Sequence, residues 1–218
     1  MAEVFILSGG RVAPEPDGGL VRPTVAFLRS ADQTMLFDAG VHSQRRALRE
    51  RLLELGLQPE DIQLVFLSHL HWDHALNFDF FPSARFVVNA KELESAGRTP
   101  VRDRATPPYL ARLLTESAVV TSVTGGTLLP GISLLPTPGH TEGHTSLLVE
   151  TAAGHVVLAG DAFPRRDVLE SGVPDPIFWD PRVAGESLRL ALDVADVIVP
   201  GHDEPFFRTT GGPAGRRF

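Results

Sequence analysis

Short apolar segments separated by turn residues recur along the whole chain. Many are rich in β-branched residues and are bounded by Gly, Pro, Asp or Asn, which is typical of β-strands. In the first half this pattern predicts strands at residues 4–7, 24–28, 34–37, 64–67 and 85–88. Between residues 43 and 57, Leu48, Leu52, Leu53 and Leu55 recur at helical spacing among charged residues, which predicts an amphipathic helix that covers a sheet.

The second half repeats this alternation. Strands are predicted at residues 118–123, 132–135, 145–150, 156–158 and 197–199, with a helix at 183–194 before the last strand. Two strand-rich halves, each closed by a helix, indicate an α/β fold with α/β/β/α layers. We expect one domain over residues 1–218, since no repeat, linker or low-complexity tract divides the chain.

Two segments show neither the strand pattern nor the helical spacing of apolar residues. Residues 97–108 are rich in Arg and Pro, and residues 164–181 contain four prolines together with Phe178 and Trp179. Long irregular loops in a compact domain often carry function, so we expect these segments to border the functional site.

Composition narrows the chemistry. With 218 residues, 43% of them apolar, the chain can form a continuous core, and its formal charge of −7 disfavours a nucleic-acid substrate. The absence of cysteine leaves imidazole and carboxylate groups as the candidate metal ligands. Because the start lacks a basic, apolar leader and no long uncharged apolar run follows, we predict a cytosolic protein without a membrane anchor.

The densest chemical signal follows the strand predicted at 64–67. In the segment SHLHWDH, four candidate ligands, His69, His71, Asp73 and His74, fall within six residues. In extended chain the alternate residues His69 and His71 share a face, and a turn into helix can direct Asp73 and His74 toward a second site. The spacing therefore suggests two metal ions.

One short segment cannot complete the coordination of two metals, so distant residues must contribute. Three further candidates stand on glycine-bearing turns at predicted strand ends. They are His140 in TPGHTEGH, Asp161 in AGDA and His202 in VPGHD.

Together these residues resemble the signature of the metallo-β-lactamase superfamily, H-x-H-x-D-H followed by separate His, Asp and His residues. The resemblance covers nearly the whole chain and implies the four-layer α/β/β/α sandwich of that fold. It implies that His69, His71 and His140 bind one metal, that Asp73, His74 and His202 bind the other, and that Asp161 bridges both. Asp38 resembles the early Asp-x-Gly turn of the family, and we expect it to orient ligands rather than bind metal.

Several other residues could belong to the functional site or have only a structural or surface role. His144 lies on the same turn as His140, and we expect it to hydrogen-bond beside the ligands. Trp72 is equally consistent with a pocket wall and with core packing. We expect ordinary structural or surface roles for His42, His155, Tyr109 and the arginines 98, 102 and 104.

The resemblance implies a hydrolase with two divalent metal ions, with zinc preferred and iron, manganese or cobalt as alternatives. By the same resemblance, a hydroxide shared by the metals would attack an ester or lactone carbonyl, and Asp73 would be the candidate proton acceptor or shuttle. We expect a small ester-like substrate; whether the chain forms a homo-oligomer stays open.

Within the superfamily, the motifs resemble those of N-acyl homoserine lactonases and of small metallo-β-lactamase-domain proteins of animals. The lactonases often carry a tyrosine three residues after the bridging Asp, where this chain has Pro164. The alternatives are a phosphodiesterase or nuclease on the same site, a glyoxalase II-like thioester hydrolase, disfavoured because only sixteen residues follow His202, and a non-catalytic metal-binding protein.

Overall fold

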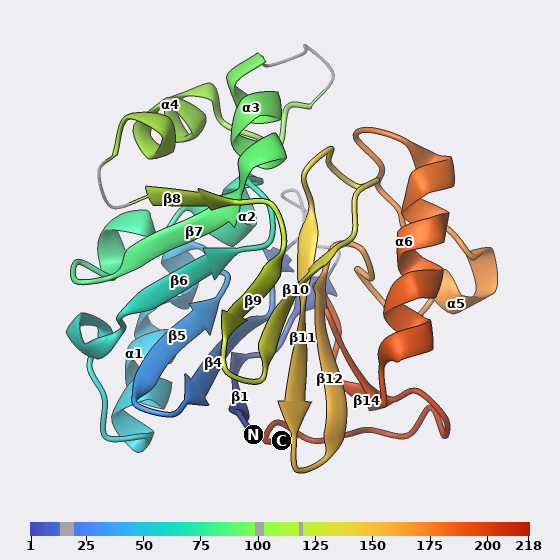
Figure 1. Ribbon diagram of the computed structural model, residues 1–218, viewed down its shortest axis with the longest axis horizontal. Coiled ribbons are helices and arrows are strands. Elements are labelled where there is room, and N and C mark those ends of the chain that lie inside the picture. Colours follow the sequence, from blue (N-terminus) through green and yellow to red (C-terminus); the bar gives the residue numbers. More distant parts are fainter. Residues whose placement is uncertain (14–19, 99–102, 118–119) are drawn as a thin grey trace.

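Two six-stranded sheets form the centre of the protein (Figure 1). The computed structural model describes residues 1–13, 20–98, 103–117 and 120–218. The first sheet has the order β1-β4-β5-β6-β7-β8. Its strands are β1 (Glu3–Ser8), β4 (Val25–Ser30), β5 (Gln33–Phe37), β6 (Leu64–Leu67), β7 (Arg85–Asn89) and β8 (Val120–Val123). The run from β5 to β8 is parallel, and helices α1 (Arg45–Glu54), α3 (Ala90–Arg98) and α4 (Pro108–Glu116) occupy the crossovers that parallel pairing needs.

The second sheet has the order β14-β13-β12-β11-β10-β9. Its strands are β9 (Gly126–Leu129), β10 (Ile132–Pro136), β11 (Thr145–Thr151), β12 (Gly154–Gly160), β13 (Val197–Pro200) and β14 (Phe206–Phe207). Only the pair β12 and β13 is parallel, because the helices α5 (Val168–Ser171) and α6 (Pro181–Val194) lie between them in the chain. The other elements include the short helix α2 (Trp72–Ala75), which lies between β6 and β7 in the chain, and a separate hairpin of β2 (Arg11–Ala13) and β3 (Leu20–Arg22).

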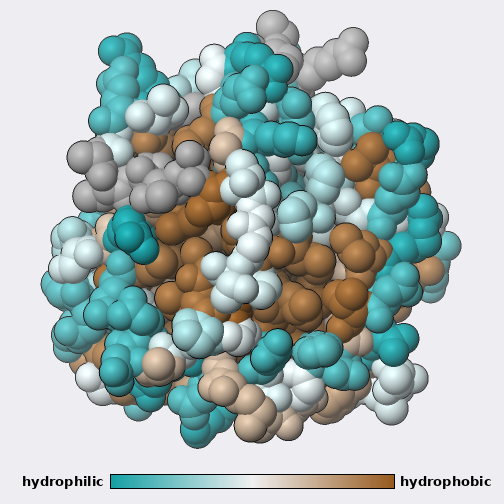
Figure 2. Space-filling view, in the orientation of Figure 1, coloured by the Kyte–Doolittle hydropathy of each residue, from teal (hydrophilic) through white to brown (hydrophobic). Residues whose placement is uncertain are grey.

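Three buried apolar layers hold the sandwich together. Side chains such as Val4, Phe66 and Leu158 fill the space between the sheets. Leu48 and Leu52 of α1, with Leu110 and Leu114 of α4, cover the outer face of the first sheet. The outer face of the second sheet is covered by α6 (Figure 1). In the same orientation, apolar residues gather in the middle of the face and polar residues surround them (Figure 2). The architecture confirms the predicted α/β/β/α sandwich.

Most strands predicted from the sequence are confirmed, with ends that differ by one or two residues. Of the strand predicted at 118–123, residues 118 and 119 lie outside the described part of the chain. The helix predicted at 183–194 begins earlier, at Pro181, because the Asp180 carboxylate accepts hydrogen bonds from the backbone N–H groups of Arg182 and Val183 and caps it.

The sequence analysis missed α3 and α4. The segment 97–108 was predicted as irregular, but its first two residues end α3 and Pro108 begins α4. Proline suits the first turn of a helix because no intrahelical partner is available there for an N–H group. In the described residues no helix has the length and the apolar character needed to cross a membrane.

Replacing Leu158 by alanine should lower the free energy of unfolding by about 2–5 kcal/mol, because this fully buried side chain fills the layer between the sheets. Leu190→Ala on the exposed face of α6 is the matched control and should change stability by less than about 0.5 kcal/mol. Chemical denaturation of both variants measures the difference, and equal losses would contradict this packing assignment.

Candidate metal centre

All seven candidate ligands lie at one edge of the sandwich, where strands of both sheets end. The segment from His69 to His74 follows β6, His140 lies between β10 and β11, Asp161 follows β12 and His202 follows β13. The carboxyl ends of parallel strands point to the same edge of their sheet. In the sandwich, this edge of the first sheet, at β6, lies beside the corresponding edge of the second sheet, at β12 and β13, so the loops after these strands meet at a common site.

The first group contains His69, His71, His140 and Asp161, whose candidate ligand atoms all lie within 4.8 Å of one another. The Nε2 atom of His140 is 3.0 Å from Nδ1 of His71 and 3.3 Å from Oδ2 of Asp161. The Nε2 atom of His69 is 4.0 Å from the same carboxylate oxygen. All four side chains are buried.

The second group contains Asp73, His74 and His202, which meet the same distance limit. The Nε2 atom of His74 is 3.4 Å from Nε2 of His202 and 3.6 Å from Oδ2 of Asp73. His202 Nε2 is 3.5 Å from that Asp73 oxygen. The structure therefore brings together all of the predicted ligands, in two groups.

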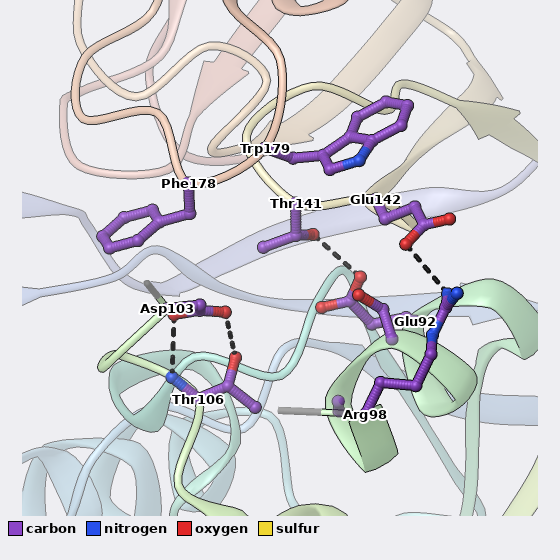
Figure 3. A pocket seen from close by; sticks show the side chains of 10 residues that line it. Glu92, Arg98, Asp103, Thr106, Thr141, Glu142, Phe178 and Trp179 are labelled. Atoms are coloured by element: carbon purple, nitrogen blue, oxygen red, sulfur yellow. Dashed lines mark hydrogen bonds and ion pairs between the residues drawn. The ribbon is translucent and has the colours of Figure 1, made fainter. Parts of the chain in front are cut away.

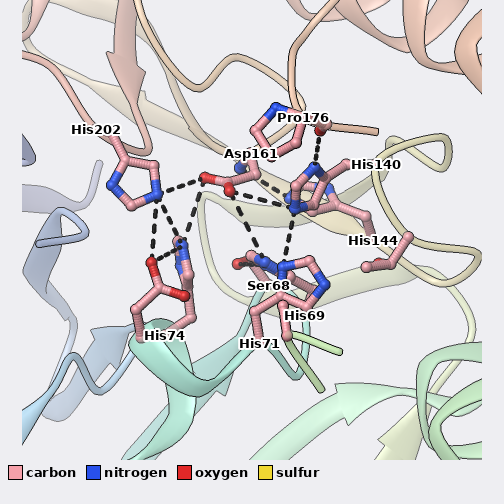
Figure 4. A network of polar contacts seen from close by, with 12 residues as sticks. Ser68, His69, His71, His74, His140, His144, Asp161, Pro176 and His202 are labelled. Carbon is pink, nitrogen blue, oxygen red and sulfur yellow. Dashed lines mark hydrogen bonds and ion pairs between the residues drawn. The ribbon is translucent and has the colours of Figure 1, made fainter. Parts of the chain in front are cut away.

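Asp161 lies between the two groups (Figure 4). Its Oδ2 atom faces His140 and His69, while its Oδ1 atom is 3.4 Å from Nε2 of His74 and 3.2 Å from Nε2 of His202. Gly201 leaves room for this carboxylate, since a Cβ atom there would lie 2.2 Å from Oδ1. One carboxylate thus offers one oxygen to each group, as bridging requires.

Backbone carbonyl groups fix the orientation of two of the imidazoles. Nδ1–H of His140 donates to the carbonyl oxygen of Pro176 at 2.8 Å, and Nδ1–H of His202 donates to that of Arg22 at 3.0 Å. A carbonyl oxygen only accepts, so each neutral ring carries its proton on Nδ1 and directs the lone pair of Nε2 toward the centre.

Asp38 orients candidate ligands of both groups. Its Oδ2 atom lies 2.7 Å from Nδ1 of His74 and accepts the hydroxyl of Ser68 at 3.0 Å. The Ser68 oxygen in turn lies 2.9 Å from Nδ1 of His69. Asp38 is fully buried and adopts a left-handed backbone conformation, with φ of 60°. Its position agrees with the predicted orienting role.

The electrostatics favour a cation at the centre. Burial lowers the pKa of His140 to about 3 and holds the pKa of His69 well below its usual range, so both rings keep free lone pairs. Burial opposes the charged form of Asp161, but His202, His74 and His140 hold its pKa well below the usual range.

Three buried atoms of the candidate ligands have no hydrogen-bond partner: His69 Nε2, His71 Nε2 and Asp161 Oδ1. Unpaired buried acceptors cost free energy unless a cation or proton lies between them. Imidazole nitrogens and carboxylate oxygens are ligand types that zinc accepts, so the residues present fit two divalent metal ions.

His144 lies beside the centre and belongs to neither group. Its Nε2 atom accepts the backbone N–H of Asp161 at 3.1 Å, and its Nδ1 lies 3.0 Å from the hydroxyl of Thr137. Both nitrogens are thus occupied, which agrees with the predicted hydrogen-bonding role. Burial and the adjacent His140 hold the pKa of His144 well below its usual range.

The structure also places the other residues for which the sequence offered two interpretations. Trp72 lines the cavity above the centre, together with Pro164. Tyr109 is 66% exposed and lies outside that lining. The ordinary surface readings agree with the structure for His42, His155, Arg98 and Arg104, whereas Arg102 lies outside the described residues.

Sequence reasoning missed two acidic residues beside the first group. Asp103 Oδ1 lies 3.3 Å from Nε2 of His71. Burial opposes the charged form of Asp103, but His71 and Thr106 hold its pKa well below the usual range. Glu92 is fully buried beside the loops that carry His71 and His140. Neither Asp103 nor Glu92 stands in a recognisable motif, so no signal in the sequence could have marked either residue as part of the site.

Comparison with known proteins now identifies the family. The sequence profile of the metallo-beta-lactamase superfamily matches residues 18–202. The chain belongs to this superfamily. Its structure also resembles a solved protein of Thermotoga maritima with a TM-score of 0.75 and 26% sequence identity, over 94% of this chain and 99% of that one.

Two curated relatives extend the comparison. Metallo-beta-lactamase domain-containing protein 1 of Xenopus laevis is 35% identical over 175 residues, which cover 79% of this chain and 67% of the relative. An N-acyl homoserine lactonase of a Bacillus species is 33% identical over 158 residues, which cover 70% of this chain and 60% of the lactonase. The superfamily and its hydrolase relatives support the predicted metal-dependent hydrolase.

Asp38→Asn should weaken metal binding by about 10–100-fold, because a carboxamide retains one acceptor oxygen where the carboxylate oxygens serve Ser68 and His74. Zinc titration against a competing chelator measures the affinity. Asp79→Asn, at an exposed carboxylate, is the control and should bind zinc like the parent protein. Parental affinity in Asp38→Asn would contradict the orienting role.

Proposed function

We propose that this protein is a dinuclear metal-dependent hydrolase that cleaves esters or lactones. The observation that carries the proposal is the position of Asp161, whose oxygens face separate groups of buried His and Asp side chains. The proposed ligands are His69, His71 and His140 for one ion and Asp73, His74 and His202 for the other, with Asp161 shared. Zinc is the proposed metal, and iron, manganese and cobalt suit the same donors.

A cavity of about 240 Å³ opens above the centre. Its walls are mainly apolar, with Val12, Val21, Trp72, Pro164, Pro176 and Phe178 among the lining residues. Such a cavity suits the apolar part of an uncharged acyl substrate, whose carbonyl then lies over the candidate ligands.

The charges in this cavity favour a neutral ester over a phosphodiester. The arginine in its described lining, Arg165, is paired with Asp167 at 2.8 Å, and the carboxylates of Asp73 and Asp175 also line it. An anionic phosphodiester would meet these carboxylates without a free arginine in the described lining. Together with the chain's net charge of −7, this argues against a nucleic-acid substrate.

Two divalent metal ions held by these residues would lower the pKa of water at the site and polarise the substrate carbonyl. The chain supplies the remaining functions. Asp161 and the imidazoles fix the reaction centre, and the apolar walls limit the water around the substrate. Asp73 lies beside His74 and His202 and also lines the cavity, so we assign it the acceptance of a proton from the reacting water and its transfer to the leaving alkoxide.

The lactone class is supported by the Bacillus lactonase, of which the matched region spans 60%. Pro164 stands where such lactonases often carry a tyrosine, so this chain lacks that hydroxyl for the substrate carbonyl. The polarising role then falls to the metal centre, and the substrate need not be an N-acyl homoserine lactone.

The test is metal content by elemental analysis, measured in the same samples as hydrolysis of a lactone, an aryl ester and an aryl phosphodiester. We expect about two metals per chain and turnover of the lactone or the aryl ester. Removal of the metals with a chelator should abolish turnover, and added Zn²⁺ should restore it. Trace metal after reconstitution, or turnover of the phosphodiester alone, would refute the proposal.

Asp73→Asn should lower kcat by about 10²–10⁴-fold, because the amide cannot accept a proton from the reacting water. The comparison is made at equal metal content, since Asp73 is also a proposed ligand. Asp193→Asn, an exposed carboxylate on α6, is the control and should keep parental kcat. An Asp73→Asn protein with two metals and parental kcat would exclude the proton-transfer role.

A further inference from the structure

A buried carboxylate outside the two groups joins the loops that carry the first group. Glu92 lies in the first turn of α3, and only 2% of its surface is exposed. Its carboxylate points toward Thr141 (Figure 3). Its Oε1 atom accepts the backbone N–H of Leu70 at 3.0 Å. Its Oε2 atom accepts the hydroxyl of Thr141 at 2.8 Å and the backbone N–H of Gly143 at 3.0 Å.

These donors lie next to proposed ligands. Leu70 stands between His69 and His71 on the loop after β6, in the first sheet, and Thr141 directly follows His140 on the loop between β10 and β11, in the second sheet. Glu92 thus holds together two loops that belong to different sheets. Hydrogen bonds to a charged, buried acceptor are stronger than neutral ones, so this connection resists separation of the loops.

The packing around Glu92 leaves little freedom. A Cβ atom on Gly143 would lie 2.1 Å from the backbone nitrogen of Glu92, so the loop after His140 lies directly against the start of α3. The adjacent Asn89 side chain donates to the Thr145 hydroxyl at 2.8 Å, and the Thr145 N–H donates to the Ser68 carbonyl at 3.0 Å. The carboxylate is therefore one of several contacts that fix the two loops.

The second group is held differently. Its His74 and His202 are oriented by Asp38 and by the carbonyl oxygen of Arg22, and each hydrogen bond of Glu92 described above reaches a loop of the first group. The loop after β6 also carries Asp73 and His74, but its contact with Glu92 is made at Leu70, between His69 and His71. Apart from this loop, Asp161 and the Asp38–Ser68 contact, the two groups have separate supports.

We propose that Glu92 is a positioning residue that sets the separation between His69, His71 and His140, and so controls metal affinity at the first group with little effect on the second. This inference rests on the proposed two-metal function.

The decisive variant is Glu92→Gln. Three donors converge on two carboxylate oxygens, and an amide keeps one oxygen while its NH₂ group faces a donor on the other loop. One loop must therefore lose its connection. Glu94→Gln on the same helix is the matched control, because the Glu94 side chain is exposed and makes an ion pair with exposed Arg98 at 3.8 Å.

The experiment measures Zn²⁺ affinity in two backgrounds that isolate the groups. His202→Ala disables the second group and His140→Ala disables the first. Adding Glu92→Gln should weaken Zn²⁺ binding by about 10–100-fold in the His202→Ala protein and by less than about 3-fold in the His140→Ala protein. Glu94→Gln should change neither. Equal weakening in both backgrounds, or none in the first, would overturn the proposal.

Thr141→Val covers the case in which Glu92→Gln does not fold. It removes one of the three hydrogen bonds and should cause a smaller loss with the same bias toward the first group. An unbiased loss would overturn the role of Glu92. A parent protein that binds fewer than two metals would instead refute the proposed function, so the two failures are distinguishable.

Discussion

The carboxylate of Asp161 lies where the two groups of candidate ligands meet, and the arrangement of the other buried polar side chains depends on it. Lone pairs of His69 and His140 face one of its oxygens, while His74 and His202 face the other. So many electron-rich atoms remain stable in a buried site only when positive charge lies among them. Two divalent ions satisfy this requirement with the donors present.

This concentration of charge needs a rigid frame, which comes from a surrounding layer of hydrogen bonds. Asp38 and two backbone carbonyl groups fix imidazole orientation, and His144 holds the backbone of Asp161. Glu92 adds a connection of another kind, because it fixes the distance between loops rather than the rotation of a ring. Its partners come from both sheets, so the geometry of the site depends on how the sheets pack.

The cavity above the centre, which is the proposed substrate site, shares residues with this frame. Trp72 and Phe178 form part of its wall, and the Phe178 ring meets the His71 and His140 rings edge-on, with centroids 4.6 and 5.3 Å away. The segment that contains Pro176 and Phe178 thus lines the proposed substrate cavity and also supports proposed ligands, since the carbonyl of Pro176 orients His140. Changes in this loop should therefore affect substrate preference and metal binding together.

The sequence by itself determined the central strands, the four-layer class and the candidate ligands. Strand periodicity is local, and the spacing from His69 to His74 carries its chemistry within a few residues. The role of Asp38 was also accessible, from its resemblance to a family turn. The helices α3 and α4 were missed because each has nine residues with a short apolar face, and prolines near Pro108 suggested a loop.

Only the tertiary structure decided which atoms meet. It showed that each oxygen of Asp161 faces a different group, that Trp72 lines the cavity, and that Glu92 joins two loops. Glu92 and Thr141 are 49 residues apart in the chain, and no local pattern encodes that contact. Such pairs depend on the packing of two sheets across a shared core, which places distant loops within hydrogen-bonding distance.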